Sequence, residues 1–135
     1  MERMYGSLDD LLEGEPGLPL VVKRSLLADV VRGLLYLHTR NPPIIHCDLN
    51  SRNILLTSAL VAKISDFVRA CAMNLRPDQT LTRFPGTMVY MPPEAFVEHP
   101  RYGLPLDIFS YGHLALFTLT QVRKEVDNLF VDIHY

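Results

Sequence analysis

A short polar run between apolar segments, His46–Asn53, constrains this chain more than any other feature. Ile44–Ile45 precedes it and is expected to be a short buried strand. Two further apolar runs follow, Ile54–Leu56 and Val61–Ile64, with Thr57–Ser58 at the turn between them. Short apolar runs on either side of a turn predict a β-hairpin. The polar run is therefore expected to form a loop between short strands.

The predicted hairpin also determines which polar side chains meet. Asn53 stands at its start and Asp66 just past its end, so antiparallel pairing brings them together although 13 positions separate them. An amide oxygen and a carboxylate are hard ligands of the kind that Mg²⁺ prefers. Asp48 adds a second carboxylate that can accept the proton of a hydroxyl group. This spacing of two carboxylates and an amide is what phosphoryl transfer requires.

The order of these residues resembles that of the eukaryotic protein kinases. In that family the signature H-R-D-L-x-x-x-N is followed by D-F-G and then by A-P-E. The present chain carries His46–Asn53, Ser65–Phe67 and Met91–Glu94 in the same order. Three ordered elements are much more specific than any one of them. The resemblance covers about residues 1–122, and residues 123–135 form a divergent tail that matches no motif of the family.

The resemblance implies a protein-kinase-like fold that is mainly α with short β pairs (α+β). A complete kinase domain in the family is about twice as long as this chain of 135 residues. Residues 1–122 are therefore expected to form a partial kinase domain, the lower lobe only, from the hinge region to a buried central helix.

Three helices are expected from the spacing of apolar residues. Ser7–Leu12 predicts a short helix that Ser7 caps, with acidic residues in the first turn. Residues 20–39 predict a long amphipathic helix, which the prolines that follow end. Residues 106–122 are apolar around nearly the whole circumference, as in a helix buried at the centre of a domain. Residues 68–90 predict an exposed loop.

The resemblance also implies roles for five residues of a nucleotide-dependent site. Asp48 is the catalytic base or the group that orients the substrate hydroxyl, while Asn53 and Asp66 hold Mg²⁺ against the phosphates of ATP. Leu55 corresponds to the floor beneath the adenine ring. Arg52 stands where the tyrosine-specific branch has an arginine that helps to neutralise the transferred phosphate. For Arg52, a solvated surface arginine is the alternative.

Three more residues resemble structural members of the kinase site. His46 and Phe67 correspond to the lower members of a regulatory stack of apolar side chains that bridges the two lobes. Asp107 corresponds to a helix aspartate that accepts backbone N–H bonds from the catalytic loop. A satisfied core histidine and a plain N-terminal helix carboxylate are the alternatives.

The substrate class is indicated by residues 86–94. They resemble the substrate-docking loop of serine/threonine kinases, particularly of the tyrosine-kinase-like group, in which G-T-x-x-Y-M-x-P-E recurs. This similarity outweighs Arg52, because the tyrosine-specific branch has a Pro-x-Lys/Arg-Trp stretch that this chain lacks. The implied activity is transfer of the ATP γ-phosphate to serine or threonine of proteins. Thr80 and Thr82 are the expected phosphorylation sites, and Thr87 is an expected structural member of the docking loop.

Three departures from the family pattern bear on activity. Cys47 replaces the arginine that reads a phosphorylated activation loop, and Val68 stands where glycine follows Asp-Phe. The glycine-rich loop, the strand lysine and its partner glutamate are not in this sequence. The isolated chain is thus expected to be inactive, and a non-catalytic, kinase-derived binding module (a pseudokinase) stays open beside a catalytic kinase. A small-molecule phosphotransferase of the aminoglycoside-kinase type is disfavoured, because such enzymes lack the docking loop.

Composition limits the partners and the location. The chain is 48% hydrophobic and 21% charged, with a formal net charge of -2 at pH 7, which does not favour nucleic acid. No apolar run reaches the roughly 20 residues that span a bilayer, and the start lacks the apolar core of a signal peptide. An intracellular, cytoplasmic location is expected, and a tether elsewhere in a longer protein stays compatible with it. Cys47 and Cys71 are expected to be free thiols. The expected partners are a protein substrate and a regulatory protein at the exposed lobe interface.

Overall fold

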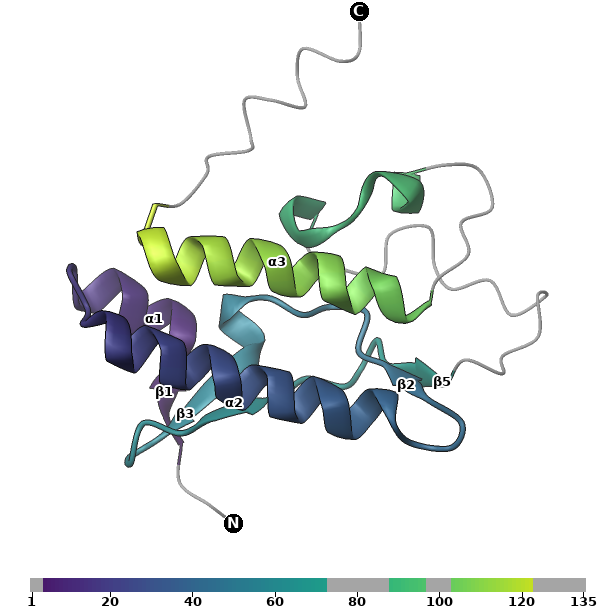
Figure 1. Ribbon diagram of the computed structural model, residues 1–135, viewed down its shortest axis with the longest axis horizontal. Helices are drawn as coiled ribbons and strands as arrows, with labels where there is room; N and C mark the ends of the chain where they lie inside the picture. The colour runs from purple at the N-terminus through teal and green to yellow at the C-terminus, as the bar shows by residue number, and fades with distance from the viewer. Residues whose placement is uncertain (1–3, 73–87, 97–102, 123–135) are drawn as a thin grey trace, which may run out of the picture.

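The computed structural model describes residues 4–72, 88–96 and 103–122 (Figure 1). The helices are α1 (Leu8–Gly14), α2 (Leu20–His38) and α3 (Leu104–Thr120). The strands are β1 (Met4–Ser7), β2 (Ile44–Ile45), β3 (Ile54–Thr57), β4 (Ala62–Ile64) and β5 (Cys71–Ala72). Three 3₁₀ turns complete the order: η1 (Ser51–Asn53), η2 (Met88–Tyr90) and η3 (Pro93–Phe96). The described part of the chain is therefore α+β, in agreement with the predicted class.

Two small antiparallel sheets position the polar run. In the first, β3 lies between β1 and β4, and Ile54 of β3 pairs with Ile64 of β4. The predicted hairpin is thus confirmed. In the second, β2 pairs with β5. The prediction that residues 68–90 form an exposed loop is wrong at Cys71–Ala72, because this short strand exists only through its pairing with distant β2, which no local pattern reveals.

The three helices pack with the larger sheet around one apolar core. Helix α2 contacts both β4 and α3, and Figure 1 shows α3 running along it. At Gly33 the approach of α2 to β4 is so close that an added β-carbon would lie 2.8 Å from Cδ1 of Ile64. The fully buried apolar side chains of this core lie on α1, α2, β3 and α3 and in the loop after β2; they are Leu8, Leu26, Val30, Leu49, Ile54, Leu56 and Leu114.

Helix α1 begins with the predicted serine cap. The Ser7 hydroxyl accepts the Asp10 N–H at 3.1 Å, and the Asp10 carboxylate accepts the N–H and the hydroxyl of Ser7 at 3.0 and 2.8 Å. These reciprocal bonds form a capping box. The hydrogen bonds from Ser7 lower the pKa of the Asp10 carboxyl below its ordinary value. The bond from the Ser7 backbone N–H has the largest effect, followed by the bond from its hydroxyl.

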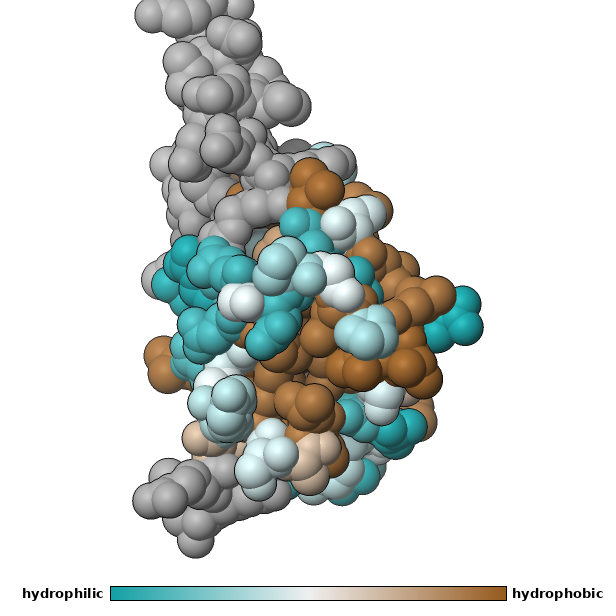
Figure 2. Space-filling view, turned by 90° about the vertical axis from the view of Figure 1, so that its left-hand side faces the viewer, coloured by the Kyte–Doolittle hydropathy of each residue, from teal (hydrophilic) through white to brown (hydrophobic). Residues whose placement is uncertain are grey.

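Helix α3 differs from its prediction in extent and in burial. It spans Leu104–Thr120, and within the described residues it has a buried and an exposed side, rather than being covered nearly all round. Leu114 is fully buried, whereas Ile108 is 57% exposed and Leu119 is 43% exposed. Apolar composition shows what a helix is able to bury, not how many neighbours cover it. Figure 2, seen from the side of α1, shows hydrophobic surface gathered over much of the described part of that face.

Within the described ranges, no helix is long and apolar enough to cross a bilayer.

Several predictions concern other parts of the chain. Residues 86–87 of the docking loop, the threonines at 80 and 82, and the divergent tail at 123–135 all lie outside the described residues.

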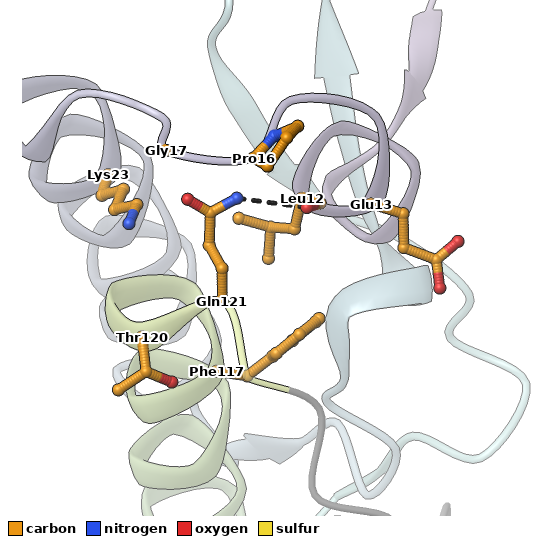
Figure 3. Close-up of a pocket in the computed structure, with 8 residues that line it drawn as sticks. All are labelled: Leu12, Glu13, Pro16, Gly17, Lys23, Phe117, Thr120 and Gln121. Carbon is orange, nitrogen blue, oxygen red and sulfur yellow. Dashed lines mark hydrogen bonds between the residues drawn. The ribbon is translucent and has the colours of Figure 1, made fainter.

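The ends of the helices meet around Gln121 (Figure 3). Its amide oxygen accepts the Leu18 N–H at 3.0 Å. Its amide nitrogen donates to the carbonyls of Leu12 and Glu15 at 3.1 and 2.9 Å. Lys23 donates from Nζ to a carbonyl near the end of α3 at 3.0 Å. The pocket at this junction has a volume of about 400 Å³, and none of its lining residues belongs to the predicted site.

We expect Ser7→Ala to destabilise the chain by about 1 kcal/mol, because the first turn of α1 loses a cap. Urea unfolding followed by circular dichroism measures the loss, and Ser58→Ala, in an exposed turn, serves as the control. The contribution of Asp10 should depend on pH. Because its pKa is lowered in the folded state, its stabilisation is present above the pKa of an unfolded aspartate and disappears as the pH falls through the lowered value. Equal stability of Ser7→Ala and Ser58→Ala would contradict the cap.

Candidate functional site

A buried carboxylate of α3 anchors the loop that carries Asp48. Asp107 is fully buried, and its carboxylate accepts the backbone N–H groups of His46 at 2.8 Å and Cys47 at 3.1 Å. His38 Nε2 of α2 lies 2.8 Å from the same carboxylate. The predicted acceptance of backbone N–H bonds by Asp107 is therefore confirmed. Three polar partners satisfy a charge that would otherwise be costly to bury.

The ring of His46 joins the loop to the segment that carries Asp66. The Asp48 N–H lies 3.2 Å from Nδ1, and Nε2 lies 2.8 Å from the Ser65 carbonyl oxygen. Since a carbonyl only accepts and an N–H only donates, both bonds require a neutral imidazole with its proton on Nε2. Phe67 contacts the ring edge to face, with the centroids 5.2 Å apart. His46 is thus a satisfied core residue that also contacts Phe67.

The Asp48 carboxylate is held in place by amide donors. Asn50 donates from Nδ2 to one carboxylate oxygen at 3.1 Å, and Asn53 donates to the other at 3.3 Å. Arg69 Nε lies 3.9 Å from that second oxygen. The Asp48 side chain keeps 15% of its surface exposed. The carboxylate is therefore oriented and still reachable by a hydroxyl group, as a proton acceptor must be.

The hairpin brings the backbone of Asn53 to the residue before Asp66. The Asn53 carbonyl accepts the N–H of Ser65 at 2.8 Å and its hydroxyl at 2.9 Å. The amide nitrogen of Asn53 also donates to the Asp48 carbonyl at 2.8 Å, and no described residue donates to its amide oxygen. Asp66 is exposed and has φ 59°, and its carboxylate accepts the N–H of Val68 at a long 3.4 Å.

These two side chains fit the ligand preferences of a magnesium ion. Among the described residues, no three His, Cys, Asp or Glu side chains cluster in a way that could hold a metal. The amide oxygen of Asn53 and the carboxylate of Asp66 are instead a small set of hard oxygen donors. Mg²⁺ is commonly bound by one or two such protein groups together with water and substrate phosphates.

The other two predicted site residues occupy different surroundings. Arg52 has a largely exposed side chain, and its Nε lies 3.8 Å from a carboxylate oxygen of Asp9. Asp9 also accepts the hydroxyl of Ser51 at 2.6 Å, so α1 supports η1 from the side. Leu55 is half-buried in the middle strand of the larger sheet, where it pairs with Lys63 of β4.

Residues 88–96 place the described part of the predicted docking loop against α3. The Ser110 hydroxyl donates to the Tyr90 carbonyl at 2.6 Å, and the Tyr90 ring contacts His113 edge to face. Met91 is buried beside them. Glu94, by contrast, is exposed.

Sequence reasoning missed three contributors to the site. In the sequence, Asp9 is recognisable only as an acidic residue in the first turn of a helix. That position does not predict its contacts with Ser51 and Arg52. Arg69 near Asp48 and Cys71 beside Cys47 come from a segment expected to be a plain exposed loop. All of these contacts depend on tertiary packing between elements.

Comparison with known proteins gives a consistent result. A family model described as the protein kinase domain matches residues 1–126. The chain is 40% identical over 108 residues to the Serine/threonine-protein kinase TNNI3K of Mus musculus. The aligned residues make up 79% of this chain and 13% of that protein. It is 42% identical over 102 residues to the Cysteine-rich receptor-like protein kinase 27 of Arabidopsis thaliana, covering 74% of this chain and 16% of that protein.

A third relative is the Receptor-interacting serine/threonine-protein kinase 2 of Bos taurus. It is 36% identical over 116 residues, covering 79% of this chain and 22% of that protein. The chain thus spans between 13% and 22% of the length of these three relatives.

We expect Asp107→Ala to destabilise the chain by about 3–5 kcal/mol, because two buried N–H groups and His38 lose their common partner. Asp107→Asn, which keeps one acceptor oxygen, should cost less. Urea unfolding measures both, with Glu15→Ala as a control for removing an exposed acid. A loss from Asp107→Ala no larger than that from Glu15→Ala would show that the anchor does not hold the loop.

Proposed function

Because the chain belongs to the protein kinase domain family, we propose that it supplies the catalytic loop and the metal ligands of a serine/threonine protein kinase, which transfers the γ-phosphate of ATP to a protein hydroxyl. The fixed and partly exposed carboxylate of Asp48 carries this proposal. In the same proposal, residues 1–122 are the lower lobe of the kinase domain, from the hinge region to the central helix α3, and residues 123–135 are a divergent tail.

The proposed chemistry begins with the substrate hydroxyl. Asp48 accepts a hydrogen bond from that hydroxyl, orients its oxygen toward the phosphate and takes its proton as transfer proceeds. Asn50 and Asn53 keep the carboxylate in position, since both donate to its oxygens. Asn53 thereby has two roles, because its amide nitrogen fixes Asp48 while its amide oxygen serves as a ligand.

The amide oxygen of Asn53 and the carboxylate of Asp66 would hold Mg²⁺, which when bound neutralises the charge of the ATP phosphates. Leu55 lies beneath the adenine ring in this proposal. Arg52 stays beside η1 through its ion pair with Asp9, and from there it is able to add positive charge near the transferred phosphate.

Serine or threonine specificity is supported by the names of two of the relatives described above, which are serine/threonine kinases. The similarity of residues 86–94 to the docking loop of the tyrosine-kinase-like group points the same way. The proposed partners are a protein substrate at that loop and a regulatory protein at the lobe interface. An intracellular, cytoplasmic site of action, where ATP is available, belongs to the same proposal.

Two residues favour a second candidate, a non-catalytic binding module. Cys47 removes a cation from the position before Asp48, and Val68 removes the conformational freedom of the glycine that follows Asp-Phe in the family. Neither change touches the hydrogen bonds that hold Asp48. The two candidates therefore differ in whether the loop functions once the rest of a kinase domain surrounds it.

A chimera separates the two candidates. Residues 44–72 would replace the corresponding segment in the kinase domain of the mouse TNNI3K relative, and transfer from radiolabelled ATP to a protein substrate would be measured. We expect transfer, and we expect Asp48→Asn to lower its rate by a factor of about 10²–10⁴, because general-base contributions are of this size. Ser58→Ala in the same chimera is the control. A folded chimera without transfer that regains it with Cys47→Arg and Val68→Gly would favour the binding module.

Metal binding is testable on the 135-residue chain itself, without turnover. We expect Mn²⁺, added with ATP as a paramagnetic substitute for Mg²⁺, to broaden the amide NMR signals of Asn53 and Asp66 first. Asp66→Asn should weaken this broadening, because a carboxylate ligand is lost, whereas Glu94→Gln removes an exposed carboxylate outside the site and should leave it unchanged. Broadening that centres on other residues, or that Asp66→Asn leaves intact, would exclude the proposed ligand pair.

A further inference from the structure

The two cysteines of the chain meet beside the loop that carries Asp48. Cys47 Sγ lies 3.5 Å from Cys71 Sγ, although 24 positions separate the residues. Both are free thiols in the structure, and the chain contains no other cysteine. Phosphoryl transfer as proposed above uses neither of them. Their contact therefore calls for an explanation of its own.

The backbone of both residues is held in place by hydrogen bonds. The N–H of Cys47 donates to the buried Asp107 carboxylate at 3.1 Å, and its φ of 68° is in the left-handed region that non-glycine residues seldom adopt. Cys71 lies in β5 and pairs directly with Ile45 of β2, two residues before Cys47. The anchor and the sheet together bring the two sulfur atoms within van der Waals contact.

The two thiols differ in their access to solvent. Cys47 is 4% exposed, whereas Cys71 is only half-buried. Burial raises the pKa of both thiols above the ordinary value, so both are mainly protonated at neutral pH and react slowly. A small oxidant reaches Cys71 first. Cys47 is then the only other thiol within reach of the oxidised sulfur.

We propose that Cys47 and Cys71 are a redox modification site that a hydroperoxide closes to an intramolecular disulfide. In the first step the Cys71 sulfur attacks a peroxide oxygen, the O–O bond breaks, and with hydrogen peroxide the leaving hydroxide becomes water. This step leaves a sulfenic acid at Cys71. In the second step the Cys47 sulfur attacks the Cys71 sulfur, the S–O bond breaks, and the departing hydroxide takes the Cys47 proton as water. Two thiols lose two electrons, and one hydrogen peroxide becomes two waters.

The disulfide would connect two functionally different segments. Cys47 immediately precedes Asp48, and Cys71 lies five residues beyond Asp66. A bond between them would make the pairing of β2 with β5 covalent. It would therefore restrict movement of the loop relative to the segment that follows the metal ligand. In a reducing compartment such a bond forms transiently and is removed by thiol exchange.

Mass spectrometry of the whole 135-residue chain tests the proposal. After treatment with hydrogen peroxide, the chain is blocked with a thiol reagent and digested with trypsin without reductant. Trypsin cleaves after lysine and arginine but not before proline, so Cys47 falls in peptide 41–52 and Cys71 in peptide 70–83. We expect these two peptides joined and free of blocking reagent, and we expect dithiothreitol to separate them. Disulfide-linked dimers, or sulfinic acid on Cys71 with Cys47 still blocked, would overturn the proposal.

Two single variants test the order of the steps. In Cys47→Ser, the sulfenic acid at Cys71 has no partner, so dimedone should trap it at residue 71. In Cys71→Ser, the buried Cys47 should remain a thiol under the same peroxide treatment. Faster oxidation of Cys47 than of Cys71 would contradict the assigned order.

A measurement on the unmodified chain does not depend on how these variants fold. Dibromobimane becomes fluorescent when both of its reactive arms bind thiols, so it should bridge Cys47 and Cys71 within one chain and join the same two peptides. Labelling of Cys71 alone would show that the two sulfur atoms do not meet in solution. The melting temperature of the peroxide-treated chain should rise and should return after reduction, because a cross-link constrains the unfolded chain. An unchanged melting temperature would contradict this.

Discussion

The hydrogen bonds from the N–H groups of His46 and Cys47 to the Asp107 carboxylate are the interaction on which the site depends. They fix the backbone at the point where β2 ends and the polar loop begins. The carboxylate is fully buried on α3, so the position of the loop follows the position of a core helix. A buried acid with several hydrogen bonds is costly to displace. The position of the Asp48 loop therefore depends on how α3 packs in the described core.

A second constraint operates on the other side of the loop. The Asn53 carbonyl accepts both the N–H and the hydroxyl of Ser65, which places Asp66 next to the residue that fixes Asp48. His46 reinforces this closure through its bond to the Ser65 carbonyl. The hairpin and the anchor thus converge on a few residues. They connect Asp48, Asn53 and the residue before Asp66, which come from segments that are separate in the sequence.

Local patterns were sufficient to predict the parts of this arrangement that depend on nearby residues. The Ser7 cap, the extent of α2 and the β3–β4 hairpin follow from spacing and turn chemistry. The role of Asp107 came from resemblance to a family. The contacts of Asp9 with η1, the strand β5 and the meeting of the two cysteines arise where distant segments pack, and no local pattern encodes them. The exposure of one side of α3 was missed for the same reason.

The most direct test of the anchor is hydrogen exchange of individual backbone amides, measured by NMR on the unmodified chain. If Asp107 fixes the loop, the amides of His46 and Cys47 should exchange only through global unfolding, with the same protection as the core residues Leu26 and Val30 of α2. Their protection should fall in parallel with that of the core as urea is added. Exchange of the His46 and Cys47 amides at the rate of an unprotected peptide, while the core stays protected, would contradict the account.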